Sequence, residues 1–185
     1  MALRNAILAS LLDGGASGYD LAKSFDGSVA AFWTATPQQL YRELDRLESQ
    51  GLVTAQLVEQ PPRPNKRIFS LTAGGRAALR EFTGATPRPT AVRDELLIQV
   101  AAVDQADPAG VRRAVSARMV AARSRLGHYQ ATRSRMLKGR TEAEFLARAR
   151  RIGPYLTLLR GISFEEDNIA WCEHALAALA ARFGE

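Results

Sequence analysis

The sequence predicts a mainly α-helical protein with one small β-hairpin. The first 85 residues show three helical patterns, two short β-type stretches and a further helical pattern, and the remainder shows helical spacing throughout. A threonine- and proline-rich stretch separates the two parts. The last helical pattern repeats its apolar residues every seven positions. We therefore expect an N-terminal domain at 1–83, a linker at 84–93 and a C-terminal domain of long antiparallel helices at 94–185.

The N-terminal part begins with two short helices. Leu3, Ile7 and Leu11 recur at helical spacing, which predicts a helix over residues 3–12. The glycine-rich stretch after it ends that helix, and Ser17 can cap a second one that closes at Gly27.

The third helix has the clearest boundaries. Thr36 is an N-cap candidate, Pro37 suits the first helical position, and Gln39 completes a near match to a capping box. Gly51 stands where a glycine after the C-cap belongs. The residues expected on the buried face are Leu40, Leu44 and Leu47.

A β-hairpin follows the third helix. Residues 52–60 and 66–72 alternate and are rich in β-branched side chains. The intervening PPRPN stretch is not expected to continue a strand, because its prolines lack backbone donors. Thr72 is expected to cap the next helix, with Gly74 and Gly75 forming a tight strand-to-helix turn.

The C-terminal part is expected to be all helix, with a short helix from Asp94, a long one over 108–138 and a last one to the C-terminus. The seam of the last helix must be buried against the 108–138 helix or against a second subunit. We expect these seam residues to form a dimer contact: Tyr155, Leu158, Ile162, Ile169, Cys172, Leu176, Leu179 and Phe183.

Bulk composition narrows the function. No apolar run is long enough to span a bilayer, and a single cysteine allows no internal disulfide, so a cytoplasmic location is the default. The net charge of +6 favours an acidic partner, with nucleic acid first. The two histidines lie far apart, and no zinc-ligand, nucleophile-elbow or phosphate-loop motif occurs. We therefore expect no enzyme activity, no metal and no cofactor.

The order of elements at 1–83 predicts a winged helix-turn-helix, whose third helix enters the DNA major groove. Such a helix contacts bases with its N-terminal residues, and here these are polar. Glutamine can bond adenine and arginine can bond guanine. The acidic residues further along, Glu43, Asp45 and Glu48, are expected to point sideways or to pair with Arg42 and Arg46.

Four stretches resemble the PadR family of transcriptional regulators: SGYDLAKSF, FWTATPQQLYRELDRLESQGLV, PPRPNKRIFSLTAGGRAAL and GPYLTLLRGISFEEDNIAWCEHALAAL. The resemblance implies an N-terminal winged helix, a C-terminal virulence-activator-like helical domain for dimerisation, and a repressor released by a small molecule. By position it places Tyr19, Gln38, Gln39 and Tyr41 near DNA and Lys66 and Arg67 in the wing. The complete set expected at double-stranded DNA is Tyr19, Lys23, Thr36, Gln38, Gln39, Tyr41, Arg42, Arg63, Asn65, Lys66 and Arg67.

Partners follow from the same reasoning. A homodimer is expected on a pseudo-palindromic operator, because one recognition helix contacts too few bases. A small aromatic effector is expected near Trp33 or Trp171, although both tryptophans are also good core residues. The runner-up function is a basic helical module that binds an acidic protein without reading DNA.

Residues 111–151 contain twelve Lys/Arg against two Glu. Three hypotheses account for this surplus: a solvated helix face, contacts with the DNA backbone, or ion pairs with Glu165, Glu166 and Asp167 across helices.

Overall fold

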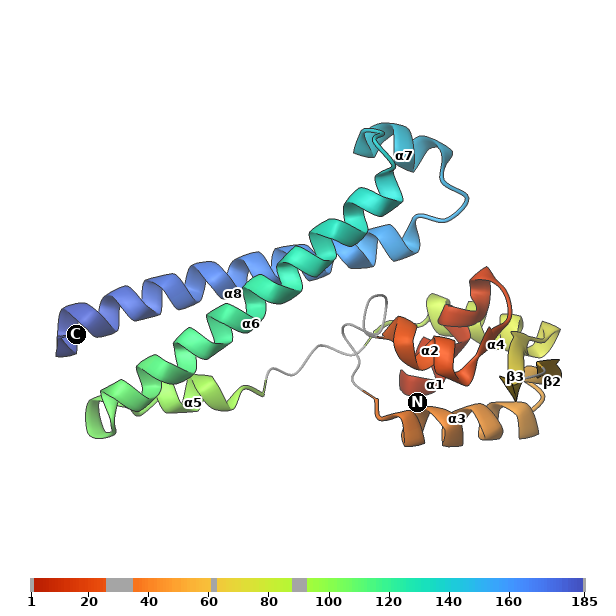
Figure 1. The fold of residues 1–185 in the computed structure, drawn as a ribbon, viewed down its shortest axis with the longest axis horizontal. Coiled ribbons are helices and arrows are strands. Elements are labelled where there is room, and N and C mark those ends of the chain that lie inside the picture. Colours follow the sequence, from red (N-terminus) through yellow and green to blue (C-terminus); the bar gives the residue numbers. More distant parts are fainter. Residues whose placement is uncertain (1, 26–34, 61–62, 88–92, 185) are drawn as a thin grey trace. The chain divides into compact units, whose positions relative to one another are not determined.

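The computed structural model describes residues 2–25, 35–60, 63–87 and 93–184, which fall into two compact units, Met1–Pro87 and Arg88–Glu185 (Figure 1). The elements of the first unit are α1 (Ala2–Ser10), the 3₁₀ turn η1 (Leu11–Asp13), β1 (Ala16–Ser17), α2 (Gly18–Phe25), α3 (Pro37–Ser49), β2 (Val53–Gln60), β3 (Arg63–Leu71) and α4 (Ala73–Gly84). Those of the second unit are α5 (Glu95–Ala101), the 3₁₀ turn η3 (Val103–Gln105), α6 (Pro108–Leu137), α7 (Glu142–Arg148) and α8 (Gly153–Phe183).

The predicted helix boundaries of the first unit follow from local caps. The Ser17 hydroxyl accepts from the Asp20 backbone N–H over 3.1 Å at the start of α2. Gly51 adopts a φ of +67° directly after Gln50, the C-cap of α3, as a glycine in that position is expected to do. The Thr72 hydroxyl accepts from the Gly75 N–H over 3.0 Å and so caps α4.

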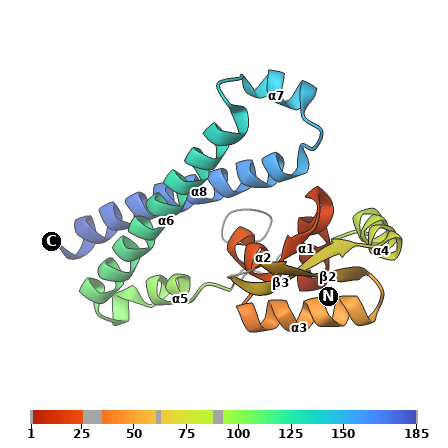
Figure 2. The same ribbon diagram turned by 45° about the vertical axis from the view of Figure 1, so that its right-hand side comes forward.

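The first unit is built on a three-stranded antiparallel sheet in the order β1-β3-β2, and α3 runs beside its hairpin (Figure 2). The hairpin was predicted, but the edge strand β1 was not. With two residues, β1 is too short to show a period, and its pairing of Ala16 with Phe69 depends on the free edge of β3. Among the described residues of this unit, eleven form the core: Ile7, Leu8, Leu11, Leu21, Leu40, Leu44, Leu47, Val53, Phe69, Leu71 and Leu79.

The prediction that PPRPN interrupts the strands was wrong for its last three residues, because β3 already begins at Arg63. Val58 pairs with Lys66 and Gln60 pairs with Arg63, so one residue of β2 faces two of β3. This is a β-bulge, and Pro64 lies in the part of β3 that pairs with no residue of β2. A proline there removes no hydrogen bond from the ladder.

The second unit is a pair of long helices, α6 and α8, which lie side by side in both views (Figures 1 and 2). One core cluster consists of Leu96, Val111, Val115, Cys172 and Leu179, so α5 also packs on the pair. At the other end, the Tyr155 ring packs on Phe145 of α7 with centroids 4.9 Å apart. The sequence interpretation missed α7, although its capping box, Thr141 with Glu144, was a readable local signal.

The seam of α8 was predicted to face either the chain's own helix or a second subunit, and in this structure α6 covers it. Within the single chain, five of the seam residues expected at a dimer contact are each less than one-tenth exposed: Tyr155, Leu158, Ile162, Cys172 and Leu179. Ile169 and Leu176 are partly buried, and Phe183 is 36% exposed. The dimer contact of this seam stays a prediction, and the exposed area of the seam lies at Ile169, Leu176 and Phe183.

Candidate nucleic-acid interface

The start of α3 is held by a reciprocal capping box. The Gln39 N–H donates to the Thr36 hydroxyl over 3.2 Å, and the Gln39 side-chain oxygen accepts from the Thr36 N–H over 3.0 Å. Both side chains were predicted to contact DNA. Their oxygens satisfy backbone groups of the helix start, so they fix where α3 begins. The DNA contact of both residues stays a prediction. The amide nitrogen of Gln39 is the part of that side chain still free of the cap.

The front of α3 presents polar side chains to solvent. Gln38, Tyr41 and Arg42 are exposed, and Tyr41 is 46% exposed. Leu40, Leu44 and Leu47 on the opposite face are each at most 2% exposed. The polar residues of this front are therefore at the surface, as the spacing predicts, because the leucine stripe takes the other side into the core.

The start of α2 lies against the front of α3. A Cβ on Gly18 would lie 2.3 Å from Cε1 of Tyr41, so the Tyr41 ring rests directly on the Gly18 backbone. Tyr19 is 70% exposed beside this contact. Lys23 is also exposed and shares a helix face with Tyr19, since the two are four residues apart. Tyr19 and Tyr41 thus belong to one continuous surface, and Lys23 extends it along α2.

Arg67 links the hairpin to α3 through ion pairs. Its Nη1 donates to Asp45 over 3.0 Å, its Nη2 donates to Glu48, and its guanidinium lies 5.0 Å from the centre of the Phe69 ring. The hydrogen bond to Asp45 is the main reason that the pKa of Arg67 lies above its ordinary value.

The acidic residues of α3 were predicted to point sideways or to pair with Arg42 and Arg46. Arg46 does pair with Glu43 at 3.7 Å, whereas Asp45 and Glu48 pair with Arg67 of the wing, a partner that spacing along α3 did not predict. Arg67 is also among the residues predicted to contact DNA, and in this structure its guanidinium pairs with the carboxylates of Asp45 and Glu48. Strand alternation puts Arg67 on the core side with Phe69, and this side faces α3.

Other wing residues remain candidates. Asn65 is exposed and Lys66 is partly exposed. Lys66 lies on the sheet face opposite Arg67, because successive side chains of a strand alternate. The Arg63 side chain lies outside the described residues, as does Trp33.

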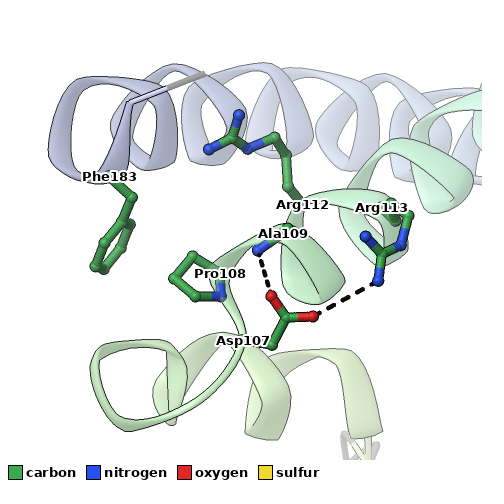
Figure 3. A pocket seen from close by; sticks show the side chains of 6 residues that line it. All are labelled: Asp107, Pro108, Ala109, Arg112, Arg113 and Phe183. Atoms are coloured by element: carbon green, nitrogen blue, oxygen red, sulfur yellow. Dashed lines mark hydrogen bonds and ion pairs between the residues drawn. The ribbon is translucent and has the colours of Figure 1, made fainter.

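Of the twelve Lys and Arg residues at 111–151, five form ion pairs within the described part of their own unit. Figure 3 shows one of these pairs, between Arg113 and Asp107. Arg125 holds Glu165 through two hydrogen bonds, which confirms the hypothesis of ion pairs with the acidic cluster on α8. Further ion pairs join Arg118 to Asp94, Arg123 to Glu173 and Arg133 to Glu142. Four acidic residues outside the segment, Asp94, Asp107, Glu165 and Glu173, thus neutralise part of its surplus positive charge.

Trp171 is partly buried on α8 and packs against the core cluster around Cys172. Within the described ranges, no three His, Cys, Asp or Glu side chains gather as metal ligands would. In the same part of the chain, no helix has the length and apolarity that crossing a bilayer requires.

The described residues define a winged-helix protein that carries a second unit of two long helices in the same chain. The chain belongs to the PadR-like family of transcriptional regulators. Residues 7–81 match the model of that family, and residues 92–180 match the model of the virulence activator alpha C-terminal domain.

Three relatives cover nearly the whole chain. A probable transcriptional regulator of Mycobacterium tuberculosis is 32% identical over 97% of this chain and 98% of its own. The negative transcriptional regulator PadR of Bacillus subtilis is 25% identical, covering 96% and 97%. Its structures with operator DNA and with p-coumaric acid have TM-scores of 0.78 and 0.72, at 24% and 23% identity, each covering 97% of this chain and 99% of PadR. The Vibrio cholerae virulence activator AphA is 30% identical, with a TM-score of 0.71 and coverage of 97% and 98%.

Proposed function

We propose that this protein is a sequence-specific DNA-binding regulator that acts as a ligand-responsive homodimeric repressor. The observation that carries the proposal is the exposed polar front of α3, held by a capping box and flanked by Tyr19. The relative PadR of Bacillus subtilis supports it, because that protein is a negative regulator and has been crystallised with operator DNA.

The proposed DNA contacts fall into two groups, side chains that can read bases and side chains that can bind phosphate. Gln38 and Arg42 are the base-reading candidates, since a glutamine amide can pair with adenine and a guanidinium with guanine. Tyr41 is the third candidate on this front. Lys23, Asn65 and Lys66 suit the phosphate backbone, which sets affinity and position but not sequence preference.

A comparison of the neighbouring residues Gln38 and Gln39 tests whether the front of α3 recognises bases. Operator sequences are first selected from random DNA, and binding is then measured by fluorescence anisotropy. Gln38→Ala is expected to weaken the selected site by about 1–3 kcal/mol while leaving random DNA unchanged. Gln39→Ala is the matched control and is expected to act mainly on stability, by about 1 kcal/mol or less, through the lost cap. If Gln38→Ala weakened binding to the selected site and to random DNA equally, Gln38 would not be a base-contacting residue.

We place the dimer contact on exposed side chains of α8 and not on the buried part of its seam. Leu156 and Phe164 on α8 are 49% and 47% exposed, and Leu156 lies on the side of the helix away from the seam. Leu156→Glu is expected to shift the wild-type dimer toward monomer in size-exclusion chromatography with light scattering. Leu179→Ala is the contrast, because it is expected to lower stability and leave the dimer intact. A monomeric wild-type protein at micromolar concentration would contradict the proposal.

A small aromatic effector is part of the proposal. PadR of Bacillus subtilis has been crystallised with p-coumaric acid, and Trp171 here offers a partly buried ring. With Trp33 replaced by Phe, fluorescence reports on Trp171 alone. A panel of phenolic acids should quench it and release DNA in the same concentration range. Unchanged fluorescence across the panel would exclude an effector site beside Trp171.

Two experiments distinguish this function from its alternatives. No gel shift with the chain's own promoter region at moderate salt would favour the protein-interaction module. A promoter fusion distinguishes repression from activation, since the relatives include both a negative regulator and a virulence activator.

A further inference from the structure

The backbone at Ser17 and Gly18, where β1 passes into α2, is held from two sides. Ser17 pairs with Ile68, so it is tied to the central strand of the sheet. The Ser17 hydroxyl also accepts from the Asp20 N–H over 3.1 Å and donates to the Asp20 carboxylate over 2.7 Å. Ser17 is 5% exposed, and Gly18 is buried as well. The sheet and the helix cap thus fix the position of this backbone step.

The Tyr41 side chain of α3 lies against Gly18 along one edge of its ring. A Cβ on Gly18 would lie 2.3, 2.9 and 3.1 Å from the Tyr41 Cε1, Cζ and Cδ1. Carbon atoms do not approach one another this closely, so no side chain fits at position 18 while the ring keeps its place. The Tyr41 ring is 46% exposed, so Gly18 supports one part of it and the rest faces solvent.

Glycine is needed at position 18 for space and not for its backbone conformation. Gly18 is not among the described glycines with positive φ, so an alanine can adopt the same backbone conformation. Alanine also has the higher helix propensity, which favours it within α2. The atoms that its methyl group meets belong to the far end of a side chain, which can rotate away. Gly18→Ala is therefore expected to displace the Tyr41 ring in a protein that still folds.

The placement of the ring matters because Tyr41 stands on the exposed front of α3. A tyrosine offers a large contact area with few rotatable bonds. A ring that is already held in its bound position loses little conformational entropy when it binds. Recognition also depends on position, since side chains that are about 0.5 Å or more out of place lose their match to the partner.

We propose that Gly18 is a positioning residue for DNA recognition. Gly18 is buried and acts through Tyr41, whose ring it holds in the orientation that distinguishes the operator from random DNA. This inference rests on the proposed function, because it concerns the same surface. It adds a residue that sets sequence preference although its own side chain offers no group to a base.

Fluorine NMR on the full chain tests the placement of the ring without DNA. The four tyrosines are replaced by 3-fluorotyrosine, and Tyr41→Phe identifies the Tyr41 signal. Gly18→Ala is expected to shift this signal and to leave unchanged those of Tyr129 and Tyr155, which belong to the second unit. An unshifted Tyr41 signal in Gly18→Ala would overturn the proposal.

Gly15→Ala is the matched control. A Cβ on Gly15 is also cramped, at 2.6 Å from the Ser70 Oγ and 2.8 Å from the Ile68 Cγ2, but its three nearest atoms all belong to β3. This variant is therefore expected to lower stability while leaving the Tyr41 signal in place. It separates the effect of crowding near β1 from the effect of moving one ring.

Anisotropy titrations with the selected operator and with random DNA test the recognition. The ratio of the two dissociation constants is expected to fall about tenfold in Gly18→Ala, the effect of one lost base contact. Tyr41→Ala should lower the ratio as well. Adding Gly18→Ala to Tyr41→Ala should change it by less than about twofold, because the methyl group then has no ring to displace. Gly15→Ala should keep the wild-type ratio.

The outcomes that would overturn the proposal differ from those that would refute the proposed function. A wild-type ratio in Gly18→Ala, or an equal further loss when it is added to Tyr41→Ala, would show that Gly18 does not act through the ring. A Gly18→Ala chain that circular dichroism shows to be unfolded would also overturn it, since the methyl group would then disturb more than one side chain. No operator binding by the wild-type protein would refute the proposed function, and the fluorine signal would still report whether Gly18 places the ring.

Discussion

Arg125 on α6 donates two hydrogen bonds to the buried carboxylate of Glu165 on α8, with Nε–Oε1 and Nη2–Oε2 distances of 2.6 and 2.9 Å. The Glu165 side chain is 4% exposed, and that of Arg125 is 44% exposed. Asn168 gives the same carboxylate a further hydrogen bond over 3.2 Å. A charged residue can thus interrupt the apolar seam of α8, because the facing helix supplies its counter-ion.

Removing this counter-ion should destabilise the helical unit. Arg125→Ala leaves Glu165 buried with Asn168 as its remaining hydrogen-bond donor, and we expect a loss of about 2 kcal/mol, less than a fully buried pair because Arg125 is partly solvated. Arg123→Ala is the matched control on the same helix, since its pair with Glu173 is more than half exposed on both sides, and should cost about 0–1 kcal/mol. Urea unfolding followed by Trp171 fluorescence, with Trp33 replaced by Phe, measures both. Equal losses of stability in Arg125→Ala and Arg123→Ala would show that the burial of Glu165 does not increase the contribution of its ion pair.

The pair of Asp94 with Arg118 should give the helical unit an acid-dependent stability. Two hydrogen bonds of 2.8 and 2.9 Å join them, and the bonds from Arg118 are the main cause that lowers the pKa of Asp94 below its ordinary 3.8. A lowered folded-state pKa means that the stabilisation is complete above pH 3.8 and is lost as pH falls through the folded value.

Asp94→Asn is therefore expected to lower stability at neutral pH by about 1–2 kcal/mol and to flatten part of its decline below about pH 4. Arg118→Gln should flatten the same part of the curve, because it removes the cause of the shift. Urea midpoints measured from pH 3 to 7 check this. An unchanged acid decline in both variants would rule out the pair as its source.

Neighbouring residues of the wing should affect DNA binding differently. Lys66→Ala is expected to reduce the slope of log affinity against log salt by about 1, as loss of one phosphate contact does. Arg67→Ala should lower affinity while leaving the slope nearly unchanged, since it frees the wing and uncovers Asp45 and Glu48. Anisotropy titrations from 50 to 200 mM salt separate the two. A slope that falls equally in Arg67→Ala would mean that Arg67 leaves α3 to bind phosphate.

Alanine substitution at the two neighbouring glycines near the start of α4 should change the stability of the first unit in opposite directions. A Cβ on Gly75 would lie 2.0 Å from the backbone oxygen of Leu52, whereas the nearest atoms to one on Gly74 lie at 3.5 Å. Gly75→Ala is expected to destabilise the first unit by about 2 kcal/mol or more. Gly74→Ala should be neutral or stabilise by up to about 1 kcal/mol through helix propensity. Thermal unfolding followed by circular dichroism checks both, and tolerance of Ala at position 75 would contradict the close approach.

Local chemistry made much of the fold predictable. The caps at Ser17, Thr36 and Thr72 each act within three residues, so the sequence shows both partners side by side. The same is true of the capping box Thr141–Glu144, whose neglect explains why α7 was missed. The exposed front of α3 was also predictable, because the leucines opposite it recur at helical spacing.

The sequence by itself determined where the caps, turns and apolar faces lie, since these depend on neighbours one to four residues apart. Only the tertiary structure decided which charges meet and which helix covers the seam. Arg67 reaches Glu48 across 19 residues and Arg125 reaches Glu165 across 40, distances at which spacing carries no information. The spacing of the α8 seam was compatible with α6 or with a second subunit, and only the tertiary structure showed that α6 packs against it. Long-range pairing depends on how elements are brought together, and period and composition do not encode that choice.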